Sequence, residues 1–180
     1  MKLTYNLADS SRYVFQASLS GDFSHVPGDF SQKQIVDGAQ TYTALEQQQS
    51  QSSSPVLDLY YFQQFTPRQS LTLNAVGTYI GTQSSDSYDE GSPYRYNVDG
   101  RTYSLLSEAI YENRLKPFTL SAGLNYNQKY TNNEYTGDVS SVTPMHHNRV
   151  YLFSEIKGTW DKLRYSAGIG GSYLHYRKQD

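Results

Sequence analysis

The fold of this chain is decided by residues 118–130, whose sequence is FTLSAGLNYNQKY. From Phe118 to Tyr126 every second residue is apolar or aromatic, and the residues between them are polar or small. Because successive side chains of a strand point to opposite faces, this alternation predicts a β-strand with one apolar face. The stretch is also longer than an average soluble strand, which has about 5–6 residues.

The same alternation recurs along the chain and predicts an all-β fold of about eight antiparallel strands. Their expected ranges are 2–7, 12–21, 55–65, 70–82, 102–114, 118–130, 148–160 and 163–176. Strands of this length cross a bilayer at a tilt, which takes about 9–11 residues. We therefore expect residues 1–180 to form one segment of an up-and-down transmembrane β-barrel in a bacterial outer membrane.

Charged residues fall in the phase opposite to the apolar one. They are Arg12, Asp58, Glu108, Glu112, Arg114, Lys129, Glu155, Lys157 and Arg164. An Arg or Lys that faces the lipid at mid-bilayer costs roughly 2–4 kcal/mol, so a lipid-facing row excludes such residues. The pattern predicts that Glu108, Glu112, Lys129, Glu155 and Lys157 face the barrel lumen.

The apolar phase is expected to face lipid, with aromatic residues near both of its ends. The residues assigned to it are Phe118, Leu120, Leu124, Tyr126, Tyr130, Trp160, Ile169 and Tyr173. Phe118 and Trp160 lie beside short links, whereas Tyr126, Tyr130 and Tyr173 lie toward long ones. Transmembrane barrels carry aromatic girdles at both interfaces, and we favour this interpretation over simple strand propensity.

The connections between the expected strands alternate between short and long. The short links lie near 8–11, 66–69, 115–117 and 161–162, and the long ones at about 22–54, 83–101 and 131–147. Such alternation is typical of barrels with tight periplasmic turns and long external loops. The polar tract 47–54 is expected to be mobile. Asp99-Gly100 predicts a tight hairpin turn, with the strand after it extending beyond the membrane.

Composition excludes several other classes of protein. The net charge of −2 and the lack of a basic stripe give no reason to expect nucleic acid binding. There is no cysteine, so no disulfide or thiolate metal site is expected. No stretch approaches the roughly 18 apolar residues of a membrane helix, and residues 2–19 lack the apolar run of a secretory signal. The chain does contain 18 tyrosines, which favour strands, membrane interfaces and carbohydrate-binding surfaces.

The order of short and long links predicts that this segment is a piece of a larger barrel. If short turns are periplasmic, the first strand descends from outside and the last one returns to it. Both chain ends would then be external, whereas a complete bacterial barrel keeps them in the periplasm. The closing residues 177–180 also lack the usual terminal aromatic residue. We expect two open strand edges, and self-association along them if the segment is produced alone.

The stretches 101–113, 118–130 and 148–176 resemble strands of Bacteroidetes TonB-dependent receptors, in particular outer-membrane β-barrel family proteins. The resemblance covers about residues 55–180 and is one of strand pattern, without an invariant motif. It implies a plugged barrel of about 22 strands that imports a nutrient with energy passed on by the TonB complex. The expected partners are therefore outer-membrane lipid, TonB through a plug region outside this sequence, and an unidentified nutrient.

Tyr88, Tyr94, Tyr96 and Tyr103 are candidates for external ligand contacts in or beside the second long link. Glycans stack on such rings. The alternative is cross-strand packing beside the Asp-Gly turn, and we favour it because three of the four rings flank that turn.

No catalytic, metal or cofactor site is predicted. His146 and His147 are adjacent on a strand and point to opposite faces, which makes a poor chelate. The acidic residues Asp86, Asp89, Glu90 and Asp99 lack a calcium-loop spacing. A polar lumen explains the Glu, Lys and Arg residues without an acid–base pair, so we do not expect an enzyme.

Two alternatives remain open. The first is a soluble extracellular β-sandwich that binds carbohydrate, whose core should be richer in Val, Ile and Leu and whose loops should not alternate strictly in length. The second is a structural or adhesive outer-membrane barrel that transports nothing.

Overall fold

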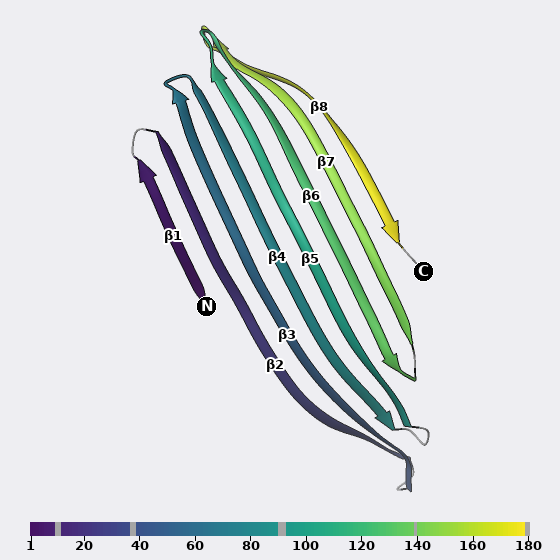
Figure 1. Ribbon diagram of the computed structural model, residues 1–180. Helices are drawn as coiled ribbons and strands as arrows, with labels where there is room; N and C mark the ends of the chain where they lie inside the picture. The colour runs from purple at the N-terminus through teal and green to yellow at the C-terminus, as the bar shows by residue number, and fades with distance from the viewer. Residues whose placement is uncertain (10–11, 37–38, 90–92, 139, 179–180) are drawn as a thin grey trace.

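The chain folds as one antiparallel sheet of eight strands. A computed structural model describes residues 1–9, 12–36, 39–89, 93–138 and 140–178. For residues 29–36, 39–48, 88–89 and 93 it describes the backbone only. The strands are β1 (Lys2–Asp9), β2 (Tyr13–Val36), β3 (Ala39–Thr66), β4 (Gln69–Asp89), β5 (Pro93–Arg114), β6 (Phe118–Gly137), β7 (Ser141–Trp160) and β8 (Leu163–Lys178). Each strand pairs with the next in the sequence, so the sheet has an up-and-down order from β1 to β8 (Figure 1).

This architecture confirms the predicted fold class of about eight antiparallel up-and-down strands. β1 pairs with β2 only over Tyr13–Ser20, whereas β4 pairs with β5 from Gln69 to Asp89 without interruption. The sheet is not closed among the described residues, because β1 pairs only with β2 and β8 only with β7. Among these residues there is no helix that is long and apolar enough to span a membrane.

The three segments expected as long loops are strands instead. Most of residues 22–54, 83–101 and 131–147 belong to β2–β7, so each long link is the distal part of a paired hairpin. These segments lack apolar alternation, which is why the sequence predicted loops there. Backbone hydrogen bonds do not need apolar side chains, and pairing that begins in the alternating part continues into the polar part.

The polar tract 47–54 was predicted to be mobile, and the structure pairs it on both sides. Its backbone lies between β2 and β4. The Oγ atom of Ser52 in this tract lies 2.7 Å from the Oγ atom of Ser24 in β2, which is a cross-strand hydrogen bond. The described side chains of the tract bury no core, as expected, and its backbone is part of the ladder.

The predicted turn at Asp99-Gly100 is wrong. Both residues lie inside β5, where Asp99 pairs with Gln83 on one side and Glu134 on the other. The hairpin between β4 and β5 reverses after Asp89 instead. An Asp-Gly pair favours a tight turn only where the flanking residues can pair with each other. Here two neighbouring strands pair with the segment and keep it extended. β5 begins at Pro93, nine residues before the predicted start of this strand at residue 102.

The short turn between β3 and β4 is held by Thr66. Its Oγ1 accepts hydrogen bonds from the backbone amides of Arg68 and Gln69, at 3.2 and 3.1 Å. Replacing Thr66 with valine keeps the shape and removes the acceptor. We expect the free energy of unfolding to fall by about 1 kcal/mol in a denaturant titration, whereas Thr66→Ser should leave it nearly unchanged. An equal loss in the two variants would contradict this role of the hydroxyl.

No second layer covers the sheet within the described part of the chain. Each strand contacts only its sequence neighbours. No large side chain among these residues is fully buried, and the buried residues are Ser70, Gly100 and Ser121. The sheet therefore has two faces and no enclosed hydrophobic core.

Candidate membrane-facing surface

One face of the sheet is apolar across all eight strands. Residues directly opposite each other in a sheet share a face, so the pairing register fixes its membership. In β1–β5 and β8, the apolar face carries the odd-numbered residues; in β3 this holds as far as Gln63. In β6 and β7, it carries the even-numbered residues. One row across it consists of Leu7, Phe15, Tyr61, Leu73, Ala109, Leu124 and Leu152.

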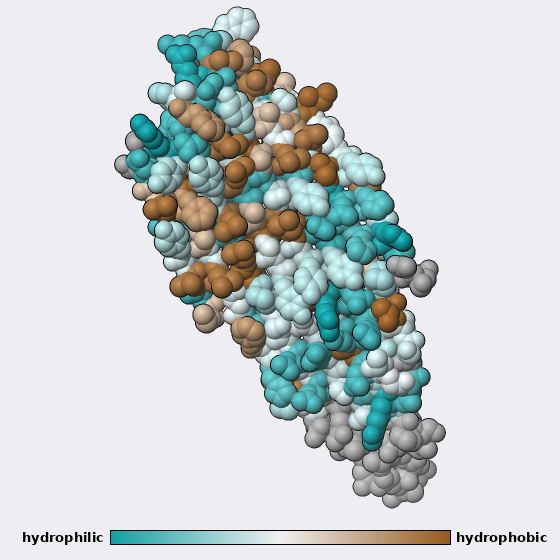
Figure 2. Space-filling view, in the orientation of Figure 1, coloured by the Kyte–Doolittle hydropathy of each residue, from teal (hydrophilic) through white to brown (hydrophobic). Residues whose placement is uncertain are grey.

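The side chains of this face are exposed. The exposed fraction is 37% for Leu124, 59% for Leu152 and 80% for Ile169. Figure 2 shows that apolar side chains gather over the part of the sheet nearer the short turns, while hydrophilic ones cover the part toward the distal hairpin ends. Contiguous exposed apolar surface of this extent marks a site of contact with a partner or a membrane.

All eight residues that the sequence assigned to the lipid-facing phase lie on this face. They are Phe118, Leu120, Leu124, Tyr126, Tyr130, Trp160, Ile169 and Tyr173. Trp160 and Tyr173, near opposite ends of their strands, are 78% and 69% exposed.

An aromatic row crosses the apolar face toward the distal hairpins. Its ring centroids are 4.9 Å apart for Tyr79–Tyr103, 6.2 Å for Tyr103–Tyr130 and 4.5 Å for Tyr130–His146. On β2–β7 the face carries no charged residue between the short turns and the level of this row. The sequence placed Tyr130 in a girdle but missed Tyr79 and His146, since only the register shows that they lie in the same row.

The apolar band runs obliquely to the pairing register. At the margin near the short turns, the apolar positions of β4 begin at Leu71. A pairing row leads from Leu71 across β5, β6 and β7 to Ile169 of β8. The apolar positions of β8, however, begin at Leu163, six residues before Ile169. At the margin toward the distal hairpins, the pairing row from Tyr79 reaches β8 at Arg177. The last large aromatic residue of this face on β8 is Tyr173, four residues before Arg177. With about 3.3 Å per residue and about 4.8 Å per strand, such a shift corresponds to strands tilted by about 35–45° to the band. Barrel strands tilt by the same amount.

The opposite face carries the charged residues predicted for the lumen. Glu108, Glu112, Lys129, Glu155 and Lys157 all lie on it. There Lys157 Nζ lies 2.8 Å from Glu155, and Arg114 lies 4.0 Å from Glu112. Asn74 donates a hydrogen bond of 3.2 Å to Glu108. These contacts balance the carboxylates with nearby cations and amides.

The four candidate ligand-contact tyrosines are not brought together. Tyr94 and Tyr96 share one face and their ring centroids are 5.7 Å apart, whereas Tyr103 lies on the apolar face. The side chain of Tyr88 lies outside the described residues, although its backbone pairs with Tyr94. Tyr103 packs across the strands against Tyr79 and Tyr130, as the favoured alternative of cross-strand packing predicts for it.

The titratable residues considered for metal binding are dispersed. His146 and His147 point to opposite faces of β7, as do Asp86 and Asp99 across their two paired strands. In the described side chains there is no group of three or more His, Cys, Asp or Glu residues that could hold a metal ion.

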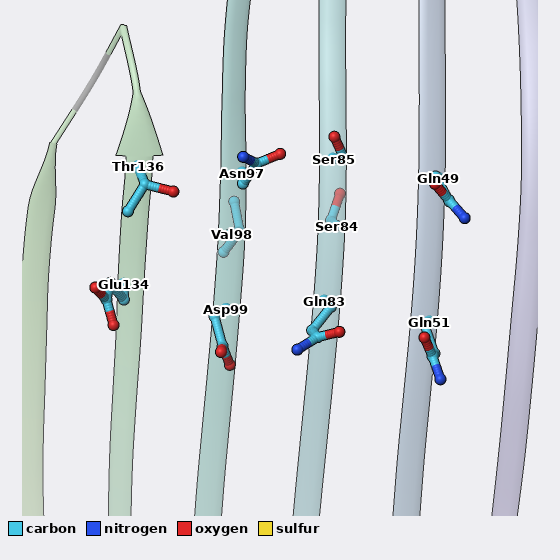
Figure 3. A pocket seen from close by; sticks show the side chains of 10 residues that line it. All are labelled: Gln49, Gln51, Gln83, Ser84, Ser85, Asn97, Val98, Asp99, Glu134 and Thr136. Carbon is cyan, nitrogen blue, oxygen red and sulfur yellow. The ribbon is translucent and has the colours of Figure 1, made fainter.

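Beyond the aromatic row lies a polar hollow of about 420 Å³ (Figure 3). It is lined from four strands by Gln49, Gln51, Gln83, Ser84, Ser85, Asn97, Val98, Asp99, Glu134 and Thr136. Hereafter these residues are called the polar hollow. Asp99 accepts hydrogen bonds of 3.2 and 2.8 Å from the Arg101 guanidinium. These bonds, together with a weaker one from Gln83, hold the pKa of Asp99 below its usual value.

The chain matches no protein-family model and no curated protein.

Proposed function

We propose that this chain is a set of transmembrane strands from an outer-membrane β-barrel, with its apolar face against lipid and its charged face toward the lumen. One observation carries the proposal: an exposed, uncharged apolar band extends over eight strands, and no other described part of the chain covers it. In water such a surface would drive aggregation, whereas a bilayer removes it from water. The oblique course of the band adds support, because it gives the tilt of barrel strands.

The soluble sandwich alternative requires a second sheet packed on the apolar face. The described strands form a single layer, and Leu124, Ile156 and Ile169 are 37%, 40% and 80% exposed. These residues would occupy the core of a sandwich and would be buried there. The two-layer packing is thus absent from the described part of the chain.

Within this proposal the barrel is a TonB-dependent receptor that imports a nutrient and catalyses no reaction. The charged and amide-rich face supports it, because such a face suits a lumen filled by water or by a plug. The strand-pattern resemblance supplies the class of receptor. The open edges of β1 and β8 would be covered by further strands of the same barrel, since an unpaired edge in lipid leaves backbone groups unsatisfied.

Fractionation of cells tests the membrane part of the proposal. The protein should sediment with the outer membrane and should leave it only in detergent. Recovery in a detergent-free soluble fraction would refute the membrane assignment.

A genetic comparison tests the receptor part. Deleting the gene should impair growth on one limiting nutrient, and loss of TonB should impair growth on the same nutrient. If the protein is in the outer membrane and neither deletion affects uptake of any nutrient in the series, a structural or adhesive barrel is the correct function instead.

A further inference from the structure

We infer that the polar hollow is a saccharide-binding site on the outer wall of the barrel, just beyond the membrane. The inference rests on the proposed orientation, in which the apolar face meets lipid. It concerns a ligand outside the lumen and therefore a different site from the import path.

The position of the hollow follows from the register. Gln51, Gln83, Asp99 and Glu134 continue the apolar face of β3–β6 beyond the aromatic row. From Tyr79 to Gln83 is four residues, about 13 Å along a strand. Along strands tilted by about 35–45° this corresponds to a height of about 10 Å. If Tyr79 and Tyr103 lie at the interface, this distance places the hollow in the layer of lipid headgroups and surface sugars.

The chemistry of the lining favours hydroxyl groups. The amides of Gln49, Gln51, Gln83 and Asn97 each offer donors and an acceptor, and the hydroxyls of Ser85 and Thr136 do both. Sugar hydroxyls also donate and accept, so such a mixed set can satisfy neighbouring hydroxyls of one ring. A volume of about 420 Å³ falls within the range of small-molecule sites, about 300–1,000 Å³.

Charged ligands fit this hollow less well. Asp99 and Glu134 are directly opposite each other in the sheet, so an anion would meet two carboxylates. A cation would compete with Arg101, whose guanidinium already binds Asp99 through two hydrogen bonds. A neutral ligand meets neither obstacle, and the carboxylate oxygens remain acceptors for its hydroxyls.

An exposed aromatic ring lies on the same face as the hollow, and Arg101 separates the two along β5. Tyr103 is 49% exposed and lies on the same face as Asp99, four residues further along β5. Tyrosine rings present an apolar face and a polar hydroxyl, which suits the less polar face of a sugar ring. The hollow itself supplies hydrogen-bonding groups, and an oligosaccharide that extends past Arg101 would reach this ring.

A binding experiment tests the inference on the full outer-membrane protein in detergent. The probes are an array of neutral oligosaccharides, an array of acidic oligosaccharides and purified lipopolysaccharides. We expect retention of a neutral oligosaccharide, either free or as the neutral O-antigen chain of a lipopolysaccharide. The double variant Gln51→Leu/Gln83→Leu should weaken it about tenfold, because each side chain contributes a hydrogen bond worth a few-fold in affinity.

The control is Gln16→Leu, which makes the same change at an exposed position on the opposite face of β2 and should bind like the unmodified protein. Retention of the lipopolysaccharide alone identifies the saccharide as part of a lipid, and retention of free oligosaccharide identifies a soluble source. Retention of acidic oligosaccharides alone, no retention, or equal retention by the double variant would overturn the inference. Outer-membrane recovery of each variant shows separately whether the membrane assignment holds.

Discussion

Replacing Leu124 with arginine is expected to destabilise the folded protein in a bilayer by about 2–4 kcal/mol. Leu124 lies in the apolar band of β6, and its row neighbours Ala109 and Leu152 are also apolar. A guanidinium there would face lipid near the middle of the band, where it loses its hydration without gaining a partner. The measurement is a denaturant titration of the barrel in liposomes, together with recovery from the outer membrane.

The matched control is Asn125→Arg, one residue further along the same strand. This side chain points to the opposite face, and its position is paired with Glu108. A cation there meets a carboxylate in a polar environment, so we expect a change within about 0.5 kcal/mol. If the two arginine variants were equally stable, or if the Asn125 variant were the weaker one, the assignment of the faces would be wrong.

Replacing Gly123 with valine is expected to cost about 1–3 kcal/mol of folding stability. A Cβ atom at this position would collide with the ring of Phe153 and would lie 3.1 Å from the backbone oxygen of Ala109. The ring lies over the glycine on the charged face, and the neighbouring backbone cannot move without breaking the ladder. Overpacking of this kind forces the side chain out of its position.

Gly77→Val provides the control for this prediction. No atom lies within 4 Å of a Cβ built at Gly77, which is on the apolar face of β4. We expect this variant to keep or slightly raise stability, since valine favours strands and its side chain would meet lipid. A second check is the pair Gly123→Val with Phe153→Ala, which should recover part of the loss. Equal losses at Gly77 and Gly123 would show that the Phe153 ring does not explain the effect.

The sequence predicted the alternating half of each strand better than the distal half. In β6, Leu120 and Leu124 alternate with Ser121 and Asn125, and this period alone assigned both faces correctly. In β3, residues 47–54 have no such period, and their pairing depends on the backbones of the neighbouring strands. The composition of one stretch does not show whether the strands beside it will pair with its backbone.

The candidate sites show the same division. The faces of Glu155 and Ile169 follow from the phase of their own strands, so the sequence predicted them. The aromatic row and the polar hollow combine residues from four strands and depend on the register between them, which no single stretch contains. The Asp-Gly misreading has the same cause, because β4 and β6 hold Asp99 and Gly100 in an extended strand.

Spin labels along β6 test the central claim most directly. The sequence has no native cysteine, so single cysteines at Leu124, Asn125, Tyr126 and Asn127 give unambiguous labels in bilayers. Collisions with oxygen, which concentrates in lipid, should be high at 124 and 126 and low at 125 and 127. Collisions with a water-soluble nickel chelate should follow the opposite order. Uniform accessibility along the strand, or greater nickel access at 124 and 126, would contradict a lipid-facing apolar surface.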